Sequence, residues 1–148
     1  MGAYHYKGTG LDNVYLTNGY REIKYGDETA VSVMDVDGLH KAIATHLICQ
    51  ADKLNGKEIR FLRNEIDMSQ GALADLLGVK VQTFANWEKE IHKIQGSAER
   101  LMRVYVNECL LNRKGKIGKL LAEYSALVNH MEKRMLFQET EEGWKEAA

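Results

Sequence analysis

The side chains best suited to recognition chemistry lie in the middle of the chain. Gln82, Asn86 and Lys89 recur at intervals of four and three residues, so a helix would carry them on one face. Phe84 and Trp87 would lie on the opposite face and pack inward. Glutamine and asparagine form bidentate hydrogen bonds to adenine, each contributing about 1–3 kcal/mol of discrimination between bases. A polar helix face is usually only a solvated surface, so these residues alone favour that interpretation and leave the reading of base edges as the alternative.

Catalytic patterns are absent from the sequence. Asp35, Asp37 and His40 lie close together, but both aspartates stand where a strand ends and a helix begins, and helix capping explains them. The five histidines form no HxH or HExxH pair. No GxxxxGK[ST] loop or GxSxG elbow is present. We therefore predict that the protein is not an enzyme and needs no cofactor.

The two cysteines, Cys49 and Cys109, do not form a CxxC pair. Because zinc sites in small domains usually contain such pairs, no metal site is predicted. The sparse cysteine usage fits a reducing compartment. The sequence shows no signal peptide and no apolar run long enough to span a bilayer. We therefore expect a cytoplasmic protein that has no membrane partner.

The segment from Glu58 to Glu90 resembles the lambda-repressor-like (Xre/Cro) helix-turn-helix family. Ser69-Gln70 followed by LADLLGV at 73–79 is similar to the family's core, and Trp87-Glu88 is similar to its WE pair. The resemblance covers more than a third of the chain. It implies a compact helical domain that binds double-stranded DNA.

The resemblance also implies roles for individual residues. The positions that read the major groove in the family are held here by Lys80, Val81, Gln82 and Asn86. The positions that contact phosphates are held by Gln70, Thr83 and Lys89. Arg63 and Glu88 match a pair that forms an internal salt bridge between the first and third helices. Glu90 stands where the family commonly has glycine.

Local signals predict the helices that position these side chains. Asn55 and Glu58 form a capping box that opens a helix running to about Ile66. Ser69 caps a helix over 70–77, which Gly78 ends. Further helices are predicted over about 80–90 and 97–111.

The first fifty residues predict a small β-meander followed by one helix. Asn18-Gly19 is a strong hairpin signal between strands at 14–17 and 20–25. A third strand is predicted at 31–34. The helix then begins at an N-cap supplied by Asp35 or Asp37.

The C-terminal part predicts a long amphipathic helix and a short strand. Apolar residues from Ile117 to Met131 form one stripe, for which packing within the chain is favoured over a dimer seam. Met135-Leu136-Phe137 is the strand candidate.

These patterns predict a mainly α chain with a small N-terminal β-meander (α+β) and a five-helix lambda-repressor-like domain in its middle. The expected domains are 1–50, 51–112 and 113–148, the last a candidate for dimerisation. The net charge of the 148 residues is only −1, which excludes a polycationic DNA-binding protein. Residues 51–116 are nevertheless mildly basic between acidic flanks.

The expected function is sequence-specific DNA binding by a homodimeric repressor, which inserts helix 80–90 into the major groove of an operator. The alternative is an antitoxin that binds a partner toxin and represses its own operon. The overall layout resembles MqsA (YgiT-type) antitoxin-like regulators, although the zinc-binding cysteines of their first domain are missing here. A third possibility is a helix-turn-helix fold used for protein contacts only.

Overall fold

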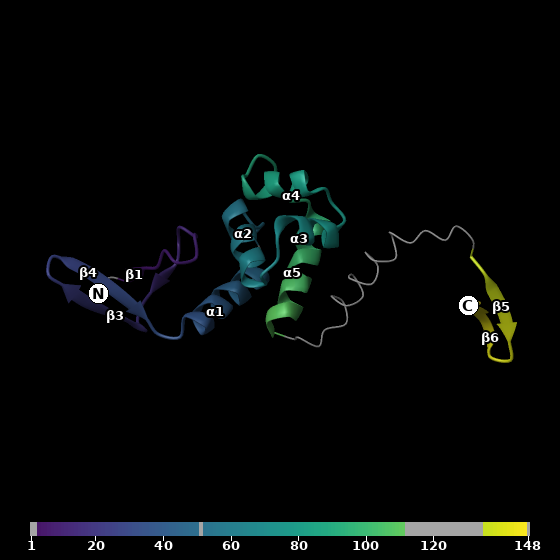
Figure 1. Cartoon of the computed structure of the whole chain (residues 1–148), viewed down its shortest axis with the longest axis horizontal. Helices are drawn as coiled ribbons and strands as arrows, with labels where there is room; N and C mark the ends of the chain where they lie inside the picture. Colours follow the sequence, from purple (N-terminus) through teal and green to yellow (C-terminus); the bar gives the residue numbers. More distant parts are fainter. Residues whose placement is uncertain (1–2, 51, 112–134, 148) are drawn as a thin grey trace.

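The computed structural model describes residues 3–50, 52–111 and 135–147 (Figure 1). Helices and antiparallel strand pairs both occur, which confirms the predicted α+β class. The elements are, in chain order, β1 (Tyr4–His5), β2 (Tyr15–Leu16), β3 (Tyr20–Tyr25), β4 (Glu28–Val33), α1 (Val36–Cys49), α2 (Gly56–Glu65), α3 (Gln70–Leu77), α4 (Val81–Glu88), α5 (Gly96–Leu111), β5 (Phe137–Thr140) and β6 (Gly143–Glu146).

Helices α1 to α5 surround one hydrophobic core (Figure 1). Each helix contributes a nearly inaccessible side chain: Leu47, Leu62, Leu73, Phe84 and Met102. The core also includes Leu11 from the N-terminal segment, so it is continuous across residue 50. Helix α1 therefore shares its core with the segment assigned to the second domain. The division into three domains stays a prediction.

The predicted caps of α2 and α3 are present. Asn55 and Glu58 exchange two hydrogen bonds of 2.9 Å, each side chain accepting from the other's backbone N–H. Ser69 Oγ accepts from Ala72 N at 3.0 Å and opens α3. Because these signals act within four residues, they fix helix starts without help from distant parts of the chain.

The predicted β-meander is wrong. Strand β2 pairs with β1, in the register Tyr4↔Leu16 and His5↔Tyr15. Strand β3 pairs with β4 around the two-residue turn Gly26-Asp27. Asn18-Gly19 therefore connects two separate sheets instead of closing a hairpin. The cause is non-local, because the N-terminal residues supply β2 with a partner, and the rings of His5 and Tyr15 stack at 4.6 Å.

Of the two candidate caps for α1, the structure uses Asp35. Its Oδ1 accepts a hydrogen bond from Gly38 N at 3.1 Å. The aspartate adopts a left-handed backbone with φ of 46°. A Cβ at position 38 would clash with the Asp35 carboxylate, so any larger residue there would require this carboxylate to shift.

The C-terminal residues form a hairpin instead of one short strand. Strand β5 begins at Phe137, two residues later than predicted, and pairs with β6 in a register from Phe137↔Glu146 to Thr140↔Gly143. The predicted apolar stripe from 117 to 131 lies outside the described residues. Within the described part of the chain, no helix is long and apolar enough to cross a membrane.

Candidate nucleic-acid interface

Helices α3 and α4 are joined by only three residues, Gly78 to Lys80. Gly78 has a φ of 75°, a left-handed conformation that glycine adopts without strain. Its N–H donates to Asp75 O at 3.1 Å, and Val79 N donates to Ala74 O at 2.9 Å. These bonds satisfy the last carbonyls of α3 and fix the direction in which α4 begins.

Helix α4 starts and stops one or two residues inside its predicted bounds of 80 and 90. Lys80 has an extended backbone with ψ of 146° and makes no side-chain cap, so the helix begins at Val81. At the other end, Glu90 takes a φ of 62° and reverses the chain. The glutamate thus adopts the left-handed conformation at the position where the resembling family commonly has glycine.

The buried face of α4 is aromatic. Phe84 and Trp87 are almost completely buried, and their ring centroids lie 5.8 Å apart. This packing turns the other face of the helix outward.

The outward face carries the predicted base-reading residues. Lys80, Val81 and Gln82 are exposed, and Asn86 is half-buried. Gln82 Nε2 donates to Asn86 Oδ1 at 3.0 Å, so the two amides lie side by side one helical turn apart. Among the predicted phosphate contacts, Lys89 is exposed and Thr83 is half-buried.

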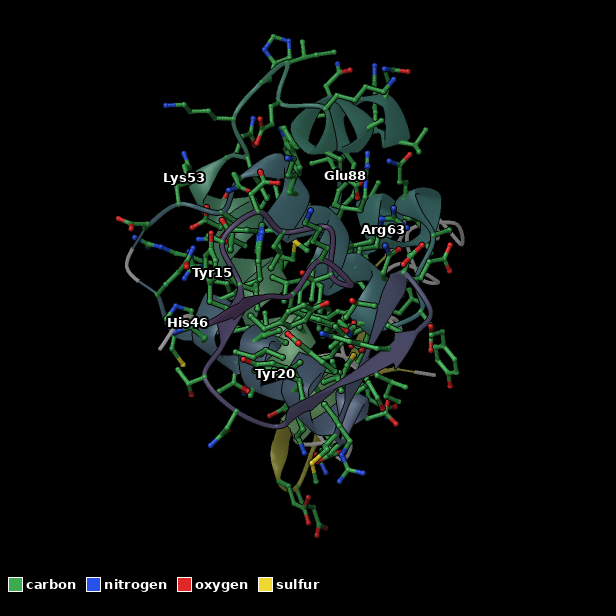
Figure 2. All side chains as sticks on the ribbon, turned by 90° about the vertical axis from the view of Figure 1, so that its left-hand side faces the viewer. Tyr15, Tyr20, His46, Lys53, Arg63 and Glu88 are labelled. Atoms are coloured by element: carbon green, nitrogen blue, oxygen red, sulfur yellow. The ribbon has the colours of Figure 1, made fainter. Side chains whose placement is uncertain are left out.

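The carboxylate of Glu88 lies at the junction of α2, α3 and α4, with no exposed side-chain surface. Arg63 donates to it twice, from Nε to Oε2 at 2.6 Å and from Nη2 to Oε1 at 3.1 Å (Figure 2). Arg63 Nη1 also donates to Met68 O at 3.0 Å. The structure thus brings together the two residues that the resemblance matches to an internal ion pair.

Two further hydrogen-bond donors to Glu88 were not predicted from the sequence. Gln70 Nε2 donates to Glu88 Oε1 at 2.9 Å, and Arg60 Nε donates to the same oxygen at 3.3 Å. Gln70, expected at a phosphate, therefore links α3 to α4 in this structure. Arg60 stands three residues before Arg63 on the same face of α2, and that spacing is the signal that could have identified it.

These contacts control the ionisation of Glu88. Burial raises the pKa of the carboxyl, but the hydrogen bonds and charges of Arg63, Gln70 and Arg60 outweigh it and hold the pKa below its ordinary value of 4.5. The ionised form is therefore the one that the fold stabilises.

This shift predicts a pH-dependent stability. A carboxyl with a depressed native pKa contributes stability that is complete above pH 4.5 and is lost as the pH falls through the native value. The difference in unfolding free energy between wild type and Glu88→Gln should be constant above that pH and shrink below it. Urea titrations between pH 7 and pH 3 measure it. A difference that stays constant down to pH 3 would contradict the assignment.

The start of α2 and the end of α4 approach closely. Gly56 N donates to Glu90 Oε1 at 3.0 Å, which ties the reversed residue to the neighbouring helix. A Cβ on Gly56 would lie 2.3 Å from Glu88 O, so only glycine permits this approach. A cavity of about 370 Å³ adjoins the contact, with apolar walls that include Ile59 and Trp87. Lys53, His92 and Lys93 also line it.

A second polar cluster attaches the N-terminal segment to the helices. His40 Nε2 and Tyr6 Oη lie 2.8 Å apart, and His40 Nδ1 lies 2.7 Å from Glu65 Oε1. The ring of His40 also packs 5.6 Å from that of Phe61. These contacts give His40 a structural role apart from Asp35 and Asp37, its neighbours in sequence.

No metal-binding cluster of three or more histidine, cysteine or acidic side chains occurs within residues 3–50, 52–111 and 135–147. The thiols of Cys49 and Cys109 are free.

Comparison of the chain with protein-family models, with curated proteins and with solved structures finds no match in any of the three.

Proposed function

We propose that this protein is a sequence-specific DNA-binding regulator of transcription, a homodimeric repressor whose α3 and α4 form a helix-turn-helix. One observation carries the proposal: a short helix whose inner face is packed into the core has Lys80, Val81 and Gln82 exposed at its start, with the amide of Gln82 hydrogen-bonded to that of the half-buried Asn86. Glutamine and asparagine amides match the donor and acceptor pattern of adenine in the major groove.

The rigidity of α4 supports this function. A recognition helix must hold its side chains at fixed positions against the base edges. Glu88, Arg63 and Gln70 tie α4 to α2 and α3 through hydrogen bonds of 2.6–3.1 Å. The three-residue connection after Leu77 restrains the other end of the helix.

Charges near α4 supply candidate phosphate contacts. Lys80 and Lys89 flank the helix and are exposed, and Lys93 follows it in the next loop. The N–H groups at the start of α3, beside Gln70, add a positive end to this surface. Two copies of α4 about 34 Å apart would fit successive major grooves of one duplex face, so an inverted repeat is expected in the operator.

Selection of bound duplexes from a random pool by the full chain, followed by sequencing, tests the proposal. We expect enrichment of an inverted repeat that the protein binds about a thousandfold or more tightly than a scrambled duplex. Fluorescence anisotropy at several salt concentrations measures the ratio. Equal affinity for selected and scrambled duplexes would refute sequence-specific binding.

A further inference from the structure

The hairpin of β3 and β4 projects from the helical body and is largely exposed (Figure 1). Every residue from Arg21 to Ala30 is exposed, including the apolar side chains of Ile23 and Tyr25. An isolated two-stranded sheet is marginally stable in water, and three or more strands are usually needed. Within the described residues, no third strand joins this sheet.

The outer edge of β3 offers a regular set of backbone groups. Met34 N donates to Gly19 O at 2.8 Å, which continues the β3–β4 ladder by one pair. In an antiparallel pair, the backbone groups of successive residues point alternately toward and away from the neighbouring strand. Since Gly19 bonds to Met34, the backbone N–H and C=O groups of Arg21 and Ile23 also point toward β4. The N–H and C=O groups of Tyr20, Glu22 and Lys24 therefore point away from β4, along an edge with which no strand of the described residues pairs.

We propose that β3 pairs antiparallel with β3 of a second copy of this chain, about a two-fold axis through Ile23. Glu22 then lies opposite the partner's Lys24, and Lys24 lies opposite the partner's Glu22. All four of these residues have outward-pointing backbone groups, as a hydrogen-bonded antiparallel pair requires. Ile23 meets the partner's Ile23 on the axis.

Charge selects this register over its neighbours. Shifting the axis to Glu22 places two glutamates opposite each other, and shifting it to Lys24 does the same for two lysines. Like charges directly opposite each other destabilise a sheet, whereas opposite charges stabilise it. The outer edge of β4 presents Thr29, Val31 and Val33, which provide no comparable charge pairing.

The product is a four-stranded sheet in the order β4–β3–β3–β4. One face collects Ile23, Tyr25 and Ala30 from each copy, because residues directly opposite in the β3–β4 register share a face. This inference names the interface of the proposed homodimer and rests on the proposed function in that respect, but DNA binding by α4 is a separate property. Both experiments below are performed without DNA.

Charge reversal tests the register by analytical ultracentrifugation of the full chain. Wild type should dimerise, and Glu22→Lys and Lys24→Glu should each raise the dissociation constant about tenfold or more. The double variant Glu22→Lys/Lys24→Glu restores opposite charges and should return the constant to near the wild-type value. Glu28→Lys, a reversal in the same hairpin on β4, is the matched control and should have little effect. A monomeric wild type, or a double variant as weak as the singles, would overturn the proposal.

Cross-linking tests the axis in a Cys49→Ser/Cys109→Ser background. Facing residues of a non-hydrogen-bonded antiparallel pair have Cα atoms about 4.5 Å apart, within disulfide range. Ile23→Cys should therefore form a disulfide-linked dimer on mild oxidation. Ala30→Cys, on the same face but one strand further out, would lie about 14 Å from its counterpart and should not cross-link. Equal cross-linking at both positions, or none at position 23, would contradict the two-fold axis.

Discussion

Arg63→Met should lower the free energy of unfolding by about 3 kcal/mol, near the lower end of the range for breaking a buried ion pair. The substitution leaves the fully buried carboxylate of Glu88 without its two shortest contacts to a charged donor. Arg60 and Gln70 still donate to one of its oxygens, which limits the loss. Denaturant titration at neutral pH measures the change.

Two variants separate burial from charge pairing in this prediction. Arg63→Met/Glu88→Leu removes both charges, so it should recover much of the stability that the single variant loses. Lys57→Met breaks an ion pair to Asp12 that has the same N–O distance of 2.6 Å. In this pair both side chains are exposed, Lys57 by 54% and Asp12 by 76%. The substitution should leave the unfolding midpoint nearly unchanged. If Arg63→Met and Lys57→Met lowered the free energy of unfolding equally, burial of the Glu88 ion pair would not account for its contribution to stability.

The helices could be predicted from the sequence because their signals are local. The exchange between Asn55 and Glu58 and the bond from Ala72 to Ser69 each span three residues. Gly78 likewise ends α3 through bonds to residues of the same turn. Such contacts form in the same way whatever the rest of the chain does.

Strand pairing could not be predicted in the same way. Asn18-Gly19 is a strong turn signal, but a turn signal does not specify which strand lies on the other side of it. The pairing of Leu16 with Tyr4 joins residues twelve positions apart, and it withdraws β2 from the hairpin expected with β3. Gly26-Asp27 forms the turn that closes the hairpin of β3 and β4.

The candidate site was predicted in part. The sequence indicates which face of a helix a residue lies on, but it does not indicate which distant group a long side chain contacts. Periodicity assigns Gln82 and Asn86 to the face opposite Phe84 and Trp87. In the structure Gln82 is exposed and Asn86 is half-buried. Periodicity does not identify what Gln70 contacts, because a polar residue at a helix start is usually solvated. Here the buried Glu88 oxygens require several donors, and Gln70 is within reach of one of them.

Gln82→Ala and Asn86→Ala should each reduce the preference for the selected duplex over a scrambled one by about 1–3 kcal/mol. Each substitution removes an amide that matches adenine. Because Gln82 donates to Asn86 at 3.0 Å, the effects of the two substitutions should not add fully in the double variant. Competition binding against duplexes changed one base pair at a time should assign each loss to a particular position.

Substitutions of the predicted phosphate-contacting residues should change affinity but not sequence preference, so they serve as a comparison for the base-reading variants. Lys89→Ala should weaken binding to all duplexes alike and reduce the salt dependence by about one phosphate contact. Gln70→Ala should also weaken all duplexes alike, with an added loss of stability because it donates to Glu88. Asn107→Ala removes an exposed amide from α5 and should change neither affinity nor specificity. If the Gln82 and Asn86 variants kept wild-type specificity, α4 would not be the element that reads the bases.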